Sequence, residues 1–185
     1  MSVIKLRTSD NGILELIENC KSTSGVSGVK LRNSHYLLGK EIAKHIELLQ
    51  NKPVVIIAMM RAGLFFANGI ADKIEEMGTP VSLLLTYNDQ LTCDDKKVIE
   101  GKDVLIVDAV INTGKSIFRL LNDLPSQRQA KIATTVIPNS SISLFDDYEL
   151  YVIRTSENKY EGAKVNIIAN GKGPDTGDRL FGTQG

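Results

Sequence analysis

The residues with the most evident chemistry lie between Val104 and Ser116. An apolar run ends at Asp108, a helical pattern begins at Ser116, and between them stand Ala109, Val110, Ile111, Asn112, Thr113, Gly114 and Lys115. Main-chain N–H groups in the first turn of a helix lack intrahelical partners, and the helix dipole adds positive potential, so a phosphate fits there. The Thr113 and Ser116 hydroxyls can donate further hydrogen bonds, and Gly114 permits close approach of the main chain. Because Asp108 can accept hydrogen bonds from sugar hydroxyls nearby, the segment predicts a ribose 5-phosphate site.

Two alternatives fit the same segment. In the first, Ala109 replaces the first glycine of a P-loop, and Lys115 reaches the β- and γ-phosphates of a nucleotide. Two features argue against this NTPase alternative. The first glycine is absent, and the motif follows a middle strand, whereas P-loops usually follow the first strand. In addition, the later apolar runs end at Pro138 and Arg154 rather than at an acidic residue that would hold magnesium. In the second alternative, Asp108 only caps the approach to the helix and the loop is a plain turn.

The rest of the chain alternates between strand and helix patterns. Short apolar runs rich in β-branched residues predict buried strands at Val54–Met59, Val81–Thr86, Val104–Asp108, Ile132–Ile137 and Leu150–Ile153. Apolar residues at helical spacing predict helices at Tyr36–Leu49, Leu64–Met77 and Ser116–Leu124. This alternation predicts an α/β fold with a parallel central sheet flanked by helices on both faces. Ligands bind beyond the carboxyl ends of such strands, where the residues above are placed.

Composition narrows the class of protein. The chain has 185 residues, 42% hydrophobic and 24% charged, which suits one globular domain. Its formal net charge of zero argues against nucleic acid as a partner. The apolar runs are too short to cross a membrane, and the N-terminus has no export signal, so we expect a cytoplasmic protein. Cys20 and Cys93 are then expected to be reduced thiols.

Three motifs resemble one family. The segment from Val107 to Ser116 resembles the phosphoribosyl pyrophosphate (PRPP) signature of type I phosphoribosyltransferases. Ala109 stands where most of that family has a second acidic residue, and uracil phosphoribosyltransferases also lack that residue. Met60–Leu64 resembles the "LRAGL" loop of uracil phosphoribosyltransferases, which implies that Arg61, Ala62 and Gly63 hold the pyrophosphate. A guanidinium suits phosphate oxygens, since it is permanently charged and fork-shaped.

The third motif is the C-terminal segment from Asp175 to Thr183, which resembles the family's "GDAGDRLFGT" tail. The resemblance implies that Asp175 lies near the base and PRPP. For Asp178 and Arg179 we expect a structural ion pair that locks the tail. The resemblance implies one type I phosphoribosyltransferase domain over 1–185, with a small hood and tail from 155–185. Residues 1–50 match the family poorly.

The resemblance also implies a reaction. PRPP and uracil would give UMP and pyrophosphate, with Asp175 and Arg61 as the catalytic residues. PRPP would contact Arg61, Ala62, Gly63, Asp175 and each residue from 108 to 116, and the base would contact Ile168, Gly173, Pro174 and Thr176. Mg²⁺ would arrive bound to PRPP, without protein ligands of its own, and the chain would form a homodimer.

The sequence departs from the family in two places. Tyr87-Asn88-Asp89 replaces "YRD", so an arginine that helps to hold pyrophosphate is missing, and Gln90–Glu100 is shorter than the usual flap. Lys96 or Lys97 could supply the charge, or both could be solvated surface residues. Near the base, Pro174 has no N–H to donate. These departures keep open a non-catalytic regulatory relative, or a different base.

Overall fold

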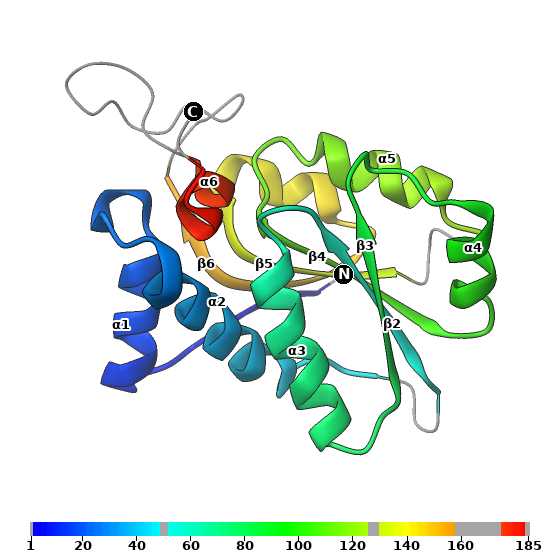
Figure 1. Cartoon of the computed structure of the whole chain (residues 1–185), viewed down its shortest axis with the longest axis horizontal. Helices are drawn as coiled ribbons and strands as arrows, with labels where there is room; N and C mark the ends of the chain where they lie inside the picture. Colours follow the sequence, from blue (N-terminus) through cyan, green and yellow to red (C-terminus); the bar gives the residue numbers. More distant parts are fainter. Residues whose placement is uncertain (1, 49–51, 126–129, 158–174, 184–185) are drawn as a thin grey trace.

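The computed structural model describes residues 2–48, 52–125, 130–157 and 175–183, whose strands form a parallel sheet (Figure 1). The strands are β1 (Ser2–Lys5), β2 (Val54–Met59), β3 (Val81–Thr86), β4 (Asp103–Val110), β5 (Ala130–Pro138) and β6 (Glu149–Ser156). Their order across the sheet is β1-β6-β5-β4-β2-β3, and each neighbouring pair is parallel. The predicted fold class is therefore confirmed.

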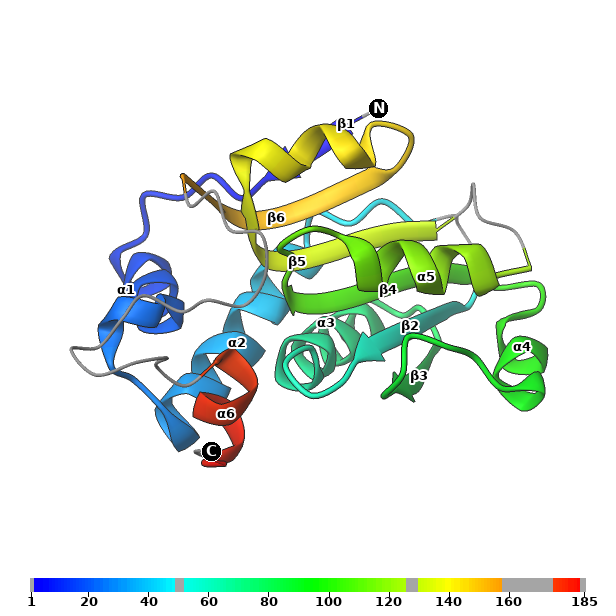
Figure 2. The same cartoon turned by 90° about the horizontal axis from the view of Figure 1, so that it is seen from above.

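Helices cover both faces of this sheet (Figure 2). The α-helices are α1 (Asn11–Cys20), α2 (Gly28–Ala43), α3 (Leu64–Glu76), α4 (Cys93–Ile99), α5 (Lys115–Asp123) and α6 (Thr176–Phe181); η1 (Ser22–Ser24) and η3 (Asn139–Phe145) are 3₁₀-helices. The helices α2 and α3 bury Leu38 and Phe66 against one face, while α5 and η3 bury Leu120 and Phe145 against the other. None of the described helices is long and apolar enough to span a membrane.

The predicted strands lie where expected, with corrections at their ends. β2 and β3 have the predicted bounds, and all six residues of β2 are buried. The prediction that β4 ends at Asp108 was wrong, because the strand continues through Ala109 and Val110, with Val110 still in register with Val136 of β5. β1 was not predicted, since it is a short edge strand with only two apolar residues, Val3 and Ile4.

The predicted helix Tyr36–Leu49 was misplaced. The observed helix α2 begins at Gly28 and ends at Ala43. Its buried stripe reaches back to Leu31, whereas Leu37 is 45% exposed on the outer face. The sequence could not show this, because the turns before Tyr36 carry many polar residues among the buried ones.

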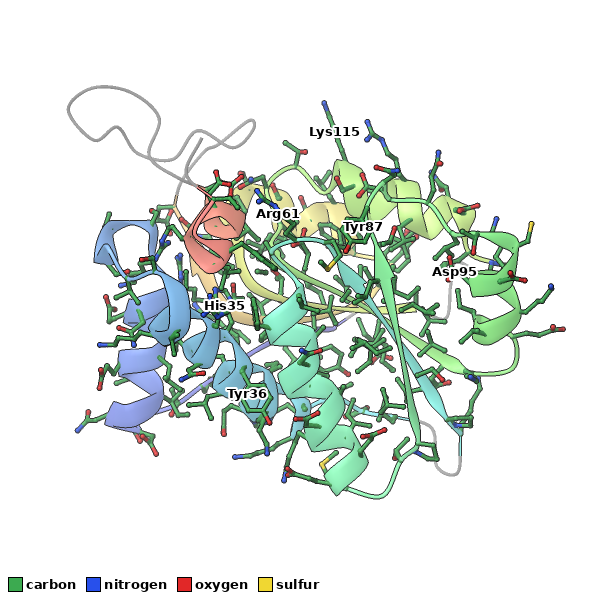
Figure 3. The ribbon with its side chains drawn as sticks, in the orientation of Figure 1. His35, Tyr36, Arg61, Tyr87, Asp95 and Lys115 are labelled. Carbon is green, nitrogen blue, oxygen red and sulfur yellow. The ribbon has the colours of Figure 1, made fainter. Side chains whose placement is uncertain are left out.

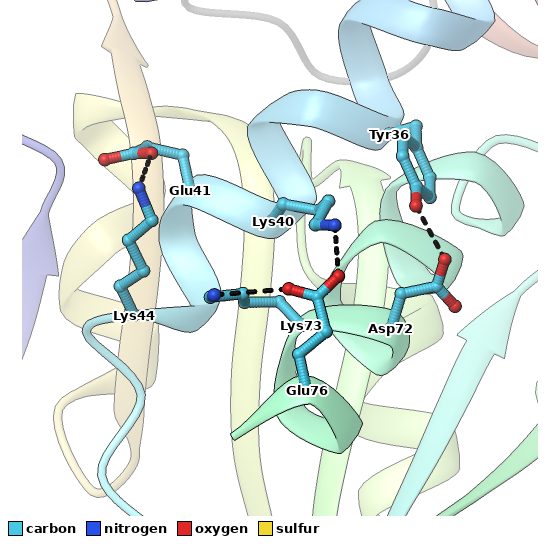
Figure 4. Close-up of polar contacts among 7 residues, drawn as sticks. All are labelled: Tyr36, Lys40, Glu41, Lys44, Asp72, Lys73 and Glu76. Atoms are coloured by element: carbon cyan, nitrogen blue, oxygen red, sulfur yellow. Dashed lines mark hydrogen bonds and ion pairs between the residues drawn. The ribbon is translucent and has the colours of Figure 1, made fainter. Parts of the chain in front are cut away.

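The crossing of α2 and α3 depends on two glycines. A Cβ atom at Gly69 would lie 1.9 Å from the main-chain oxygen of Tyr36, and one at Gly39 would lie 2.3 Å from that of Phe66. Polar contacts also join the two helices (Figure 4). Tyr36 donates to Asp72, and Lys40 pairs with Glu76, which also pairs with Lys73; Glu41 and Lys44 form a separate pair at the end of α2. The two helices therefore pack with their main chains in close contact.

Candidate functional site

Three loops follow the carboxyl ends of adjacent or nearly adjacent strands. Residues 60–63 follow β2, residues 87–92 follow β3, and residues 111–114 follow β4. β2 lies between β3 and β4 in the sheet, so these loops share one edge (Figure 1). The fold thus brings together two of the three sequence motifs, as expected for a ligand site of a parallel sheet.

The predicted phosphate loop is a tight turn that leads into α5. Gly114 is the residue before the helix, with φ 72°, and no side chain caps the first turn of α5. Asn112, Thr113 and Ser116 are partly buried there, while Lys115 is exposed and projects outward from the start of α5 (Figure 3). Since α5 is nine residues long, its first-turn N–H groups and dipole offer a favourable place for an anion.

Residues of η3 pack against this loop. The Ser141 hydroxyl donates a 2.6 Å hydrogen bond to the main-chain oxygen of Asn112. The Phe145 ring stacks on Phe118 at 4.9 Å between centroids, and a Cβ at Gly114 would lie 2.8 Å from Phe145 Cζ. Sequence analysis did not identify Ser141 or Phe145, because nothing local marks their contacts with the loop.

Asp108 stands in β4 just before the loop. Val107 and Ala109 on either side are fully buried, whereas Asp108 is partly accessible. Burial is the main cause that raises the pKa of its carboxyl, the Val110 and Ala109 N–H groups lower it, the nearby Asp89 charge raises it, and the net pKa is about 7. The Val110 N–H lies 3.5 Å from Oδ1. The carboxyl is therefore poised to change its ionisation near neutral pH.

The first residues of the predicted PRPP contact set belong to the sheet. The Ala109 main-chain oxygen accepts a hydrogen bond from the Thr135 hydroxyl. The Ile111 N–H donates to the main-chain oxygen of Val136 at 3.0 Å. Ala109 is buried, and so is Ile111. The described turn is thus shorter than the sequence indicated, and its open part begins at Asn112.

Arg61 lies in the loop after β2, next to α6 (Figure 3). Its Nη2 donates to Asp178 Oδ1 at 2.8 Å, and its Nη1 donates to the Thr183 hydroxyl at 2.6 Å. The peptide bond between Met60 and Arg61 is cis. Two residues on, a Cβ at Gly63 would lie 2.6 Å from the main-chain oxygen of Val107, so only glycine fits there. The structure thereby joins the C-terminal motif to the loop after β2.

The expected ion pair between Asp178 and Arg179 is wrong. Adjacent residues of a helix point in different directions, so these two side chains have different partners. Asp178 pairs with Arg61, whereas Arg179 is 5% exposed and donates to the main-chain oxygens of Asn19 and Val26. The second half of the tail motif is nevertheless structural, because Arg179 anchors α6 to the end of α1 and to Val26, which follows it.

The remaining predicted residues fall into two groups. Asp175 is exposed and caps α6, since its Oδ1 accepts a 2.7 Å hydrogen bond from the Asp178 N–H. Thr176 begins that helix and is partly buried. The other predicted base contacts, Ile168, Gly173 and Pro174, lie outside the described residues.

The loop after β3 leads into the short helix α4, which an ion pair links to α5. Thr92 and Asp95 form a capping box at the start of α4. Lys96 forms an ion pair with Asp123 of α5, and Lys97 pairs with Asp94 at 2.8 Å. Both lysines therefore have acidic partners, Lys96 on α5 and Lys97 within α4. Asp89, which sequence analysis did not single out, lies 3.5 Å from Arg119 and raises the pKa of Asp108.

Comparison with known proteins agrees with this arrangement. A family model described as uracil phosphoribosyltransferase matches residues 23–183. The chain belongs to this phosphoribosyltransferase family. The match begins within η1 and takes in α2, so the family extends further toward the N-terminus than the three sequence motifs indicated.

Individual relatives differ in the base that their names specify. A uracil phosphoribosyltransferase of Clostridium beijerinckii is 27% identical over 151 residues, covering 75% of this chain and 69% of the relative. A hypoxanthine-guanine-xanthine phosphoribosyltransferase of Tritrichomonas foetus is 26% identical over 135 residues, covering 65% and 72%. Membership of the family therefore leaves the choice of base to be argued separately.

Solved structures support the fold. The AQ2163 protein from Aquifex aeolicus superposes with a TM-score of 0.66 and 17% identity, over 96% of this chain and 98% of that one. A hypoxanthine phosphoribosyltransferase from Trypanosoma cruzi gives a TM-score of 0.51 and 19% identity, over 68% and 73%. At these identities the likeness shows a shared fold.

Proposed function

We propose that this protein transfers the 5-phosphoribosyl group of PRPP to uracil, which gives UMP and pyrophosphate. The observation that carries the proposal is the placement of Asp108 and the Gly114 turn at one edge of the sheet. A partly accessible carboxyl there stands one short turn away from the uncapped start of α5. In this arrangement the hydroxyls of a ribose bind to the Asp108 carboxyl, and its 5-phosphate binds to the first turn of α5.

The reaction needs no covalent intermediate with the protein. A ring nitrogen of the base forms a bond to C1 of the ribose as the bond from C1 to the pyrophosphate oxygen breaks. The nitrogen loses its proton, and pyrophosphate leaves with the bonding electrons. Positive charge develops on the sugar, so catalysis comes from a fixed ribose geometry and from stabilisation of the leaving pyrophosphate.

The protein's residues take distinct roles in this proposal. The 5-phosphate contacts the segment from Asn112 to Ser116, and Asp108 holds the ribose hydroxyls. Arg61, with Ala62 and Gly63, holds the pyrophosphate, while Asp175 at the exposed start of α6 faces the base. Mg²⁺ enters as part of the substrate, where it neutralises charge on the pyrophosphate.

Uracil is favoured by the sequence motifs that this chain shares with the uracil enzymes, especially the tail from Asp175 to Thr183. The purine phosphoribosyltransferase among the relatives makes a purine base the specific alternative. A homodimer in the cytoplasm, acting on small molecules and without nucleic acid or membrane partners, completes the proposal.

The deciding experiment measures pyrophosphate release from PRPP and Mg²⁺ with uracil, hypoxanthine, guanine and xanthine in turn. We expect release with uracil, and strongly reduced release in the Asp108→Ala variant. Release with a purine alone would keep the reaction and correct the base. Binding of PRPP without release for any base would instead indicate a regulatory relative. ATP binding that PRPP does not displace would favour the NTPase alternative.

A further inference from the structure

We propose that Asp178 is a positioning residue for Arg61, so that helix α6 completes the loop that receives pyrophosphate. This inference rests on the proposed function, which gives the Arg61 guanidinium its role. The contacts form a closed set of three side chains. Arg61 donates to Asp178 at 2.8 Å and to Thr183 at 2.6 Å, and the Thr183 hydroxyl donates to the same Asp178 oxygen at 3.0 Å.

The arginine remains able to bind an anion while it is held. A guanidinium has five N–H donors, and the contacts with Asp178 and Thr183 use two of them, which leaves three. The Arg61 side chain is 41% exposed, whereas that of Asp178 is 24% exposed. The carboxylate is thus the more sheltered partner, and the arginine side chain that it holds remains partly exposed.

Helix α6 has anchors that do not involve Arg61. Arg179 is buried and donates to the main-chain oxygens of Asn19 and Val26. Arg32 of α2 donates to the main-chain oxygen of Leu180 at 2.7 Å. These contacts hold α6 in place without the pair between Arg61 and Asp178. We therefore assign that pair to the orientation of the arginine.

Orientation has a physical benefit here. An unrestrained arginine must give up rotamer freedom when it binds a phosphate, and donors that are already oriented avoid this cost. A partly exposed ion pair contributes little to folding stability by itself. The Asp178 contact is therefore expected to influence ligand binding more than it influences folding.

The test compares dissociation constants for PRPP with Mg²⁺, and for inorganic pyrophosphate, by calorimetry. In Asp178→Asn we expect the dissociation constant for PRPP to rise about tenfold, which corresponds to roughly one charged hydrogen bond. In the Arg61→Ala background the same substitution should have little further effect, since the two residues act as a unit. Asp147→Asn, an exposed aspartate on the loop before β6, controls for the change in net charge.

Arg32→Gln separates orientation of the arginine from docking of α6. It removes an anchor of the helix but leaves the three contacts around Arg61 in place, so PRPP should bind to it nearly as well as to the wild type. An Asp178→Asn variant that binds PRPP as tightly as the wild type would overturn this inference but not the proposed function. So would an equal loss in Arg32→Gln, or an undiminished effect of Asp178→Asn in the Arg61→Ala background. A wild-type protein that binds neither PRPP nor pyrophosphate would overturn the proposed function as well.

Discussion

Ser141 of η3 and Asn112 of the turn before α5 are joined by a 2.6 Å hydrogen bond from the serine hydroxyl to the asparagine main-chain oxygen. The bond connects segments that follow two different strands, β4 and β5. It fixes the turn at the residue where the loop leaves the sheet. The shape of the proposed phosphate site therefore depends on a residue outside the motif that predicts the site.

Removing this hydroxyl should loosen the turn. In Ser141→Ala we expect the free energy of unfolding to fall by about 1 kcal/mol, the typical net value of one hydrogen bond. The affinity for PRPP should fall severalfold, because the turn is less fixed before binding. Ser141→Thr keeps the hydroxyl and should stay closer to the wild type. Denaturant unfolding measures the change in stability, and calorimetry measures the affinity for PRPP. Unchanged PRPP affinity in Ser141→Ala would contradict the role of Ser141 in holding the turn.

Gly114 should tolerate no side chain. An alanine there would adopt an unfavourable positive φ, which costs about 1–2 kcal/mol, and its Cβ would meet the Phe145 ring at 2.8 Å. Gly101→Ala is a matched control, because Gly101 has φ 74° and nothing lies within 4 Å of its Cβ position. The difference between the two variants in unfolding free energy isolates the steric cost at the ring. Equal losses would show that the ring moves aside freely.

The pKa of Asp108, raised to about 7, predicts pH-dependent binding. Above pH 7 the carboxylate accepts hydrogen bonds from ribose hydroxyls, and below pH 7 its protonated form accepts them less well. The affinity for PRPP should therefore rise with pH through about 7. Asp108→Asn keeps every other source of pH dependence, including ionisation of the substrate, so the difference between the two pH profiles reports Asp108. Parallel profiles would refute its role.

Asp108→Asn should also change how the free energy of unfolding depends on pH. The unfolded chain releases the Asp108 proton near its ordinary pKa of 3.8, while the folded chain keeps it until about pH 7. The unfolded state therefore binds fewer protons between these values, and the contribution of Asp108 to stability falls as pH rises. Asp108→Asn should thus gain stability over the wild type at pH 8 but not at pH 4, as thermal unfolding would show.

His35 predicts the opposite dependence. It is 1% exposed, neither ring nitrogen has a hydrogen-bond partner in the described parts of the chain, and burial lowers its pKa to about 4. The unfolded chain binds more protons between pH 6.5 and 4, so wild-type stability falls as pH decreases through that range. His35→Leu should remove this loss and exceed the wild type at pH 5. His45→Gln, on an exposed histidine, should retain it.

Some of this architecture follows directly from local sequence. β2 was predicted with its true bounds because a strand buried on both faces is a short continuous apolar run. α3 was predicted to within a residue, since its apolar period begins directly after Gly63. α2 was misplaced because its buried stripe starts among polar residues. The family motifs predicted a ligand class for the site, since each motif is a local segment.

The sequence by itself determined the α/β alternation, the PRPP signature around Asp108 and the family to which the chain belongs. These features depend on residues that are close together in the chain, so the sequence shows them directly. Only the tertiary structure decided that Asp178 contacts Arg61 rather than Arg179, and that Ser141 and Phe145 support the turn at Gly114. Those contacts join residues far apart in the chain, and their geometry exists only after the sheet and its helices have packed.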